Sequence, residues 1–194
     1  VVYPGDPKPK IEIATTIENE GYNLSGVYIG TQSGSHVDAP YHFSNDGTTI
    51  ENVNLSLCMG KAVLIDVSNK KSREIIELSD VKPFEEKIQS SDIVLFRTDW
   101  YKKVGTDEFF NHPYLSGEVG KYLLDNRIFT LGIDAINIDS TGGYEFPIHD
   151  QYSKADGLIA ENLAHFDKID FENPFAIFLP LKLTGCDGSP VRAV

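Results

Sequence analysis

The stretch TQSGSHVDAPYHF, from Thr31 to Phe43, concentrates side chains that can bind a metal ion. His36, Asp38 and His42 fall within seven residues, although the whole chain has only five histidines. Alternate side chains of an extended segment share a face, so these three and Gln32 are expected to point the same way. Imidazole nitrogen and carboxylate oxygen are ligands that Zn, Mn and Fe accept. The stretch therefore predicts a metal site, and the alternative is that its polar groups only hydrogen-bond a turn.

The composition of the chain bounds the class of protein. Its 194 residues are 41% apolar and 24% charged, which suffices for one sizeable core, and we expect a single domain over residues 1–194. The net charge of -12 argues against a nucleic-acid or anionic-membrane partner. No apolar run approaches the roughly 20 residues needed to span a bilayer. Cys58 and Cys186 lie far apart in the sequence, which is typical of a reducing compartment, so a cytoplasmic location is expected.

Apolar runs alternate with helical segments in the middle of the chain. The predicted buried strands are KAVLIDV (Lys61 to Val67), DIVLFRT (Asp92 to Thr98) and IFTLGID (Ile128 to Asp134). Ser79 or Asp80 is expected to cap a short helix between the first two strands, and Ser116 another helix between the second and third. Strands that alternate with helices indicate parallel crossovers and an α/β core.

The two ends of the chain predict further strands. KIEIATTIE (Lys10 to Glu18) and SGVYIGTQ (Ser25 to Gln32) alternate like strands with an exposed face and are flanked by Gly and Asn turns. We expect them to form a peripheral antiparallel layer. PFAIFLPLKL, near the C-terminus, reads as one more buried strand.

The motif GSHVDAPYHF closely resembles the signature His-x-Gly-Thr-His-x-Asp-x-Pro-x-His of the cyclase-like metal-dependent hydrolases, a family that includes bacterial kynurenine formamidase and isatin hydrolase. The likeness continues in order along nearly the whole chain, in VVYPGDP, GKAVLIDV, HPYLSGEVGKYLLDNRIFTLGID, IHDQYSKADGLIAENL and PLKLTGCDGSPVRAV. The resemblance implies a swivelling β/β/α-type single domain with a mixed β core. It also implies a homodimer, in which a neighbouring chain can close the pocket.

The resemblance implies roles for the matching residues. His36 and Asp38 would bind one metal ion, and Asp38 would bridge to a second ion that His149 and Glu161 also bind. His42 would stay off the metal as the acid/base. The sequence around the later pair suits this role, because His149 follows the Gly-rich loop TGGYEFP and Glu161 stands alone in GLIAENL.

Gln32 occupies the position where the family signature has its first His. An amide oxygen is a neutral, weaker and harder donor than imidazole, so the first site should lean toward Mn or Mg rather than Zn. Three interpretations remain open. Gln32 is a weak ligand in a two-metal site, or only one ion is kept at Asp38, His149 and Glu161, or catalysis is lost. The expected cofactor is one or two divalent ions, Zn or Mn.

The predicted function is hydrolysis of an amide, formamide, lactam or ester bond of a small molecule by metal-activated water, with His42 as acid/base. N-formylkynurenine is the candidate substrate that the family suggests. One alternative is a metal-dependent cyclase or dehydratase acting on a small carbonyl compound. The other is a binding protein that keeps the fold and has lost turnover.

Several other polar and aromatic residues receive structural interpretations. His112 is expected to cap a helix, and His165 to be a surface or packing residue. Trp100 is expected to pack in the interior, with a role in a substrate wall as its alternative. Asp134 and Asp139 follow an apolar strand, so they should be partly buried and need partners, either the backbone or groups that support a metal site.

Overall fold

A mixed seven-stranded sheet forms the centre of the protein in the computed structural model, which describes residues 1–194. From one edge to the other the strands are β10 (Phe175–Ile177), β4 (Met59–Asp66), β6 (Ile93–Arg97), β8 (Thr130–Ile133), β9 (Leu158–Glu161), β3 (His36–Asp38) and β11 (Gly188–Pro190). The four strands from β4 to β9 are parallel, whereas β10, β3 and β11 pair antiparallel with their neighbours. The expected α/β class with a mixed β core is confirmed.

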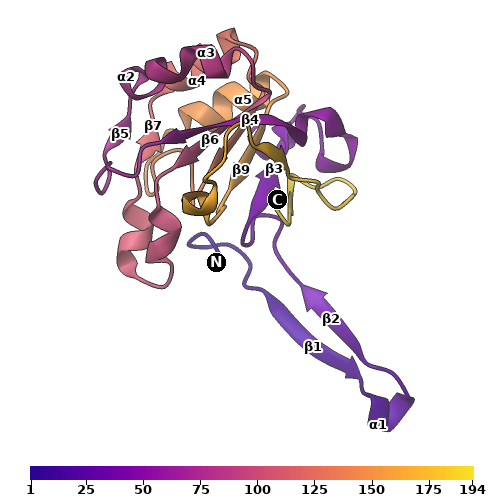
Figure 1. Ribbon diagram of the computed structural model, residues 1–194. Coiled ribbons are helices and arrows are strands. Elements are labelled where there is room, and N and C mark those ends of the chain that lie inside the picture. The colour runs from indigo at the N-terminus through magenta and orange to yellow at the C-terminus, as the bar shows by residue number, and fades with distance from the viewer.

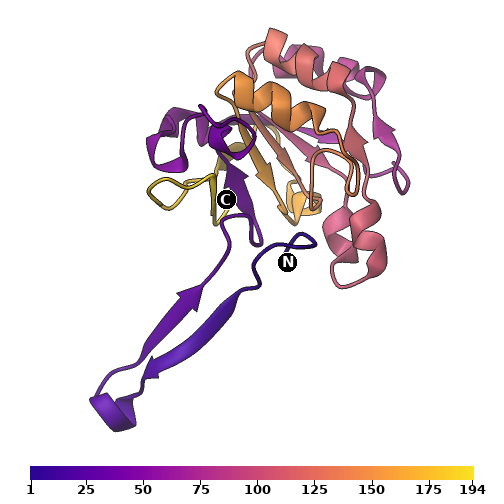
Figure 2. The ribbon, with the colours of Figure 1, turned by 180° about the vertical axis from the view of Figure 1, so that it is seen from behind.

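Helices lie along one face of this sheet (Figure 1 and Figure 2). They are α2 (Leu78–Val81), α3 (Glu85–Ile88), α4 (Gly117–Asp125) and α5 (Pro147–Lys154), and a short parallel pair, β5 (Ile75–Ile76) and β7 (Tyr114–Leu115), lies beside them. The largest hydrophobic cluster, of 22 buried residues, joins the helices to the sheet, and a second cluster of eight covers the other face. Val63 and Ala62 of β4 belong to different clusters, which explains why this strand is apolar on both faces. None of the helices is long and apolar enough to cross a membrane.

The antiparallel end of the sheet positions the histidine-rich motif. His36 and Asp38 occupy alternate positions of β3, so their side chains share a face. The register with β9 places His36 opposite Glu161, and the register with β11 places Asp38 opposite Gly188. Residues directly opposite one another in an antiparallel pair have Cβ atoms about 4.5–5.5 Å apart. Strand pairing therefore brings together residues from both halves of the chain.

An antiparallel hairpin projects from the body of the molecule (Figure 1). It consists of β1 (Lys10–Thr15) and β2 (Leu24–Tyr28), joined through the short helix α1 (Ile17–Glu20). The expected antiparallel sheet is confirmed, but it extends into solvent and does not cover the core. Ile11 and Ile13 are 74% and 77% exposed. We call β1, α1 and β2 the arm.

The predicted elements of the middle of the chain are largely confirmed. All three central strands form, and Ser116 caps α4 by accepting a hydrogen bond from the Val119 amide. The expected cap at Ser79 or Asp80 is wrong, because the N-cap of α2 is Glu77, two residues before Ser79. The Asp80 carboxylate accepts a hydrogen bond from the Glu77 amide. Of the predicted strand PFAIFLPLKL, only the three residues of β10 enter the sheet, at its edge.

His112 is a buried structural residue, and it should make the protein sensitive to acid. Its Nδ1 donates to the Pro113 carbonyl (2.8 Å), so its Nε2 accepts from the Thr141 hydroxyl (2.7 Å). Burial lowers the pKa of His112 from 6.5 to about 4. A base whose pKa falls on folding stabilises the folded state above pH 6.5 and loses that contribution as the pH falls toward 4.

The substitution His112→Gln, which keeps a donor and an acceptor but does not titrate, tests this. Between pH 7 and pH 4.5 we expect the free energy of unfolding of the wild type to fall by roughly 2–3 kcal/mol more than that of the variant. Urea unfolding at both pH values measures the difference. Equal losses in the two proteins would show that His112 is not the acid-sensitive group.

Candidate metal centre

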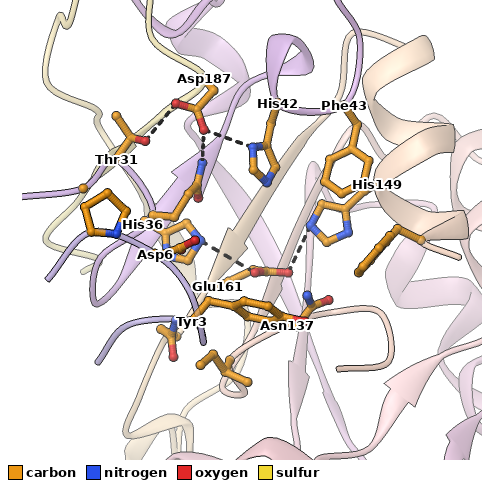
Figure 3. Close-up of a pocket in the computed structure, with 16 residues that line it drawn as sticks. Tyr3, Asp6, Thr31, His36, His42, Phe43, Asn137, His149, Glu161 and Asp187 are labelled. Atoms are coloured by element: carbon orange, nitrogen blue, oxygen red, sulfur yellow. Dashed lines mark hydrogen bonds and ion pairs between the residues drawn. The ribbon is translucent and has the colours of Figure 1, made fainter. Parts of the chain in front are cut away.

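Four buried side chains converge at the antiparallel end of the sheet. Figure 3 shows His36, His149 and Glu161 pointing toward one another. His36 and Asp38 come from β3, Glu161 from β9 and His149 from the first turn of α5. The Nε2 atom of His36 lies 3.5 Å from an oxygen of Asp38 and 3.6 Å from one of Glu161. The Nε2 atom of His149 lies 3.5 Å from the other oxygen of each carboxylate. All four side chains are 3–5% exposed.

The spacing of these atoms fits a divalent metal ion. Separations of 3.5–3.6 Å are too long for good hydrogen bonds. They match the spacing of about 3.3–3.6 Å between ligand atoms that each lie about 2.0–2.2 Å from one tetrahedral ion. Both oxygens of Asp38 are buried and have no hydrogen-bond partner. A buried, unpartnered carboxylate is costly, and a bound cation would compensate it.

Both imidazoles are oriented with Nε2 toward the centre, because their other nitrogen is engaged. The Nδ1 atom of His36 donates to the Gly34 carbonyl at 2.8 Å, and that of His149 donates to Asp139 at 2.7 Å. Asp139 also accepts the backbone amides of Ile148 and His149, so one carboxylate fixes both the start of α5 and the ring it carries. This is how proteins hold metal-binding histidines in the right tautomer. Asp139 thus has the backbone partners that were expected of it, and its support of a metal ligand stays a prediction.

The carboxylates dominate the electrostatics of the centre. Burial alone would lower the pKa values of both histidines, but the surrounding carboxylates outweigh it and raise them to about 9 for His36 and about 10 for His149. Asp38 and Glu161 act on both rings, and Asp139 acts on His149. The electrostatics of these groups therefore favour the binding of a cation between them.

The four groups do not divide cleanly into two ligand sets. Asp38 belongs to two trios, one with His42 and His149 and the other with His36 and Glu161, and the ligand atoms of each trio lie within 4.8 Å of one another. Asp38 is thus placed to be shared, as expected. Glu161, however, lies as near His36 as His149, because each of its oxygens faces a different ring. The number of ions stays a prediction.

His42 lies beside this cluster and has a different environment. It belongs to the 3-10 helix η1 (Pro40–His42), so the assumption of an extended chain fails beyond Ala39. Its Nδ1 donates to Asp187 at 3.0 Å, and its side chain is 28% exposed. Burial lowers the pKa of His42, but Asp187 and Asp38 outweigh it and raise the pKa above its ordinary value. The same contact holds the pKa of Asp187 far below its usual range.

Gln32 lines the same pocket as His36, His149 and Glu161. Its Nε2 donates to Asp187 at 2.8 Å, and its Oε1 is buried without a hydrogen-bond partner. The structure thus brings together all six residues that the sequence singled out. Ligation by Gln32 stays a prediction.

Comparison with known proteins supplies the family. A family model described as "Putative cyclase" matches residues 2–140. The chain belongs to this cyclase family. It is 34% identical to a kynurenine formamidase of Bacillus mycoides (strain KBAB4), over 99% of this chain and 89% of the relative.

Solved structures of cyclase-like proteins agree with this assignment. An isatin hydrolase bound to the product analogue thioisatinate superimposes with a TM-score of 0.87 at 25% identity, covering 96% of this chain and 80% of that one. A structure described as a potential metal-dependent hydrolase with cyclase activity gives a TM-score of 0.77 at 27% identity, covering 99% and 89%. The resemblance stated from the motif is confirmed.

The candidate metal centre of this cyclase-family chain opens into a pocket of about 440 Å³ with aromatic walls. Tyr3, Phe43 and Phe146 line it, and the Phe43 ring packs 4.6 Å from that of His149 and 5.4 Å from that of Phe146. None of these aromatic residues was predicted from the sequence. Trp100 is buried in the large cluster, as expected, and does not line this pocket.

Proposed function

We propose that the protein is a metal-dependent hydrolase that cleaves a carbon–nitrogen bond, other than a peptide bond, in a small molecule. The observation that carries this proposal is the cluster of His36, Asp38, His149 and Glu161, whose spacing fits a divalent ion. Relatives named kynurenine formamidase and isatin hydrolase support it. His36 and Asp38, with Gln32, would hold one ion, and Asp38, His149 and Glu161 a second. Mn or Zn is the proposed metal.

The chain's own residues suit acid/base chemistry beside such an ion. When bound, a divalent cation lowers the pKa of water from about 16 toward about 7 and polarises a substrate carbonyl. Since Nδ1 of His42 donates to Asp187, its Nε2 carries a lone pair and can accept a proton from water. The ring then returns that proton to the leaving nitrogen. Asp187 would stabilise the charged ring in between.

The walls of the pocket favour a substrate with an aromatic ring. Tyr3, Phe43 and Phe146 offer apolar faces beside the metal centre, and aromatic rings pack well against one another at centroid separations of 4.5–7 Å. An aryl formamide has a flat ring and one carbonyl to be cleaved. N-formylkynurenine is therefore our first candidate.

Turnover of N-formylkynurenine tests the proposal. Protein loaded with Mn or Zn is mixed with N-formylkynurenine or isatin, and the products are analysed by mass spectrometry. Hydrolysis adds one water in total, which appears as kynurenine plus formate or as ring-opened isatin. Loss of water from a substrate would instead indicate a dehydratase, and tight binding without turnover under either metal would indicate a binding protein. Either result would replace the hydrolase proposal.

We also propose that two copies of the chain form a homodimer through the arm. A two-stranded hairpin is marginally stable alone in water. Ile11, Ile13 and Val27 lie on one face of it, with Ile11 opposite Val27, and all three are more than 60% exposed. Such an apolar face on a projecting element requires a partner, and a second copy is the one that the family resemblance implies.

The change Ile13→Glu, which places a charge on the apolar face, should break this dimer. Light scattering after size exclusion is expected to give about twice the 21.5 kDa chain mass for the wild type and the single chain mass for the variant. Glu12→Gln, on the opposite face of the same strand, is the matched control and should remain dimeric. A monomeric wild type would refute the proposal.

A further inference from the structure

Asp187 is the only side chain that contacts both Gln32 and His42 by hydrogen bonds in the structure. Its Oδ2 atom accepts from Gln32 Nε2 at 2.8 Å and from His42 Nδ1 at 3.0 Å. Its Oδ1 atom accepts from the Thr31 hydroxyl at 2.8 Å. Asp187 precedes β11, whose first residue lies opposite Asp38, so the sheet register places this carboxylate beside the motif.

These contacts fix which end of the Gln32 amide is free. An amide has donors on nitrogen and an acceptor on oxygen, so only its Nε2 can satisfy the Asp187 carboxylate. The Oε1 atom is left without a partner although it is buried. In the opposite orientation two oxygens would face each other and the hydrogen bond would be lost. The carboxylate therefore selects the orientation of the amide.

The backbone next to Asp187 leaves room for this arrangement. A Cβ atom on Gly188 would lie 2.6 Å from Gln32 Nε2 and 2.7 Å from the Val37 carbonyl oxygen. Those approaches are shorter than real Cβ contacts. Asp187 accepts the hydrogen bond of the Gln32 amide nitrogen, and Gly188 leaves space for that nitrogen because it has no side chain.

We infer that Asp187 is a positioning residue that turns the Gln32 amide oxygen toward the metal centre, where it serves as the neutral donor to the ion held by His36 and Asp38. The inference rests on the metal centre of the proposed function and deepens it. A carboxylate would thereby let an amide replace the imidazole of the family motif. The same Asp187 oxygen holds His42, so the first metal ligand and the acid/base share one anchor.

The change Asp187→Ala removes this selection. With no carboxylate to accept from Gln32 Nε2, the amide can turn either end toward the centre, and its nitrogen has no free lone pair for an ion. Chelator-stripped protein is titrated with Mn²⁺ alone by isothermal calorimetry. We expect Asp187→Ala to weaken the weaker binding event by about 10–100-fold, as loss of a supporting contact to a metal ligand commonly does. Thr31→Val, which removes only the contact to Oδ1, is the matched control and should bind nearly as the wild type does.

A double-mutant cycle separates positioning from a merely structural role. If Asp187 acts through Gln32, the double variant Gln32→Ala/Asp187→Ala should bind Mn²⁺ no more weakly than Gln32→Ala alone. The absorption spectrum of Co²⁺-loaded protein should also change in the same way in both single variants. Additive losses, or unchanged affinity in either single variant, would overturn the inference. Because no substrate is present, these outcomes are independent of whether the protein proves to be a hydrolase.

Discussion

Asp38→Asn should abolish hydrolysis, because Asp38 belongs to both trios of candidate ligands. Removing a charged partner from a buried charge cluster typically costs about 3–5 kcal/mol, which corresponds to a loss of metal affinity of roughly 10²–10⁴-fold. Metal-assisted stabilisation of the transition state contributes several kcal/mol, so kcat/KM should fall by at least about 10³-fold. Metal content by plasma mass spectrometry and initial rates with the aryl formamide measure the two effects.

The same substitution on the surface provides the control for this experiment. Asp125 is exposed on α4, where it pairs only with Lys121, so Asp125→Asn should keep both metal and activity. Thermal unfolding of the two variants shows whether either has lost its fold. An Asp38→Asn protein that retains metal and wild-type turnover would remove Asp38 from the centre.

His42→Ala should lower kcat by about 10²–10⁴-fold while the metal content stays at the wild-type level. The reason is that the four groups that face one another across the centre are untouched, whereas the group that moves the proton is gone. The lost ring leaves space beside Asp187, so added imidazole should restore part of the activity. Rates with and without imidazole, together with metal content, test the assignment.

His165→Ala is the matched control for His42. His165 is exposed and does not line the pocket, so its removal should leave turnover and imidazole response unchanged. Turnover that survives His42→Ala with metal bound would show that another group carries the proton. Loss of metal from His42→Ala would instead make His42 a ligand, in line with its closeness to Asp38 and His149.

Local sequence patterns predicted the interior of the fold better than its edges. β4, β6 and β8 are apolar on both faces, and such runs identify buried parallel strands without further information. The arm was predicted as two antiparallel strands, but its projection could not be. Alternation of apolar and polar residues predicts that one face of a strand is buried. It does not predict whether the same chain or another chain buries that face.

The site was predictable only as far as local geometry reaches. His36 and Asp38 share a face because β3 is extended. His42 lies in the 3-10 helix η1, which the assumption of an extended chain did not predict. The family resemblance predicted that Glu161 binds the same ion as His149. The register between β3 and β9 also places Glu161 opposite His36. Asp187 was missed because register between distant strands cannot be read from one sequence.

The position of β3 between β9 and β11 also bears on how long the folded protein persists. Both of its neighbours come from the last quarter of the chain, so these pairings close the longest loops and are expected late in folding. An ion that binds only after β3 is paired stabilises the native state without stabilising the folding transition state. It therefore slows unfolding and leaves the folding rate nearly unchanged. Bound metal would therefore lengthen the lifetime of the folded protein once the sheet has assembled.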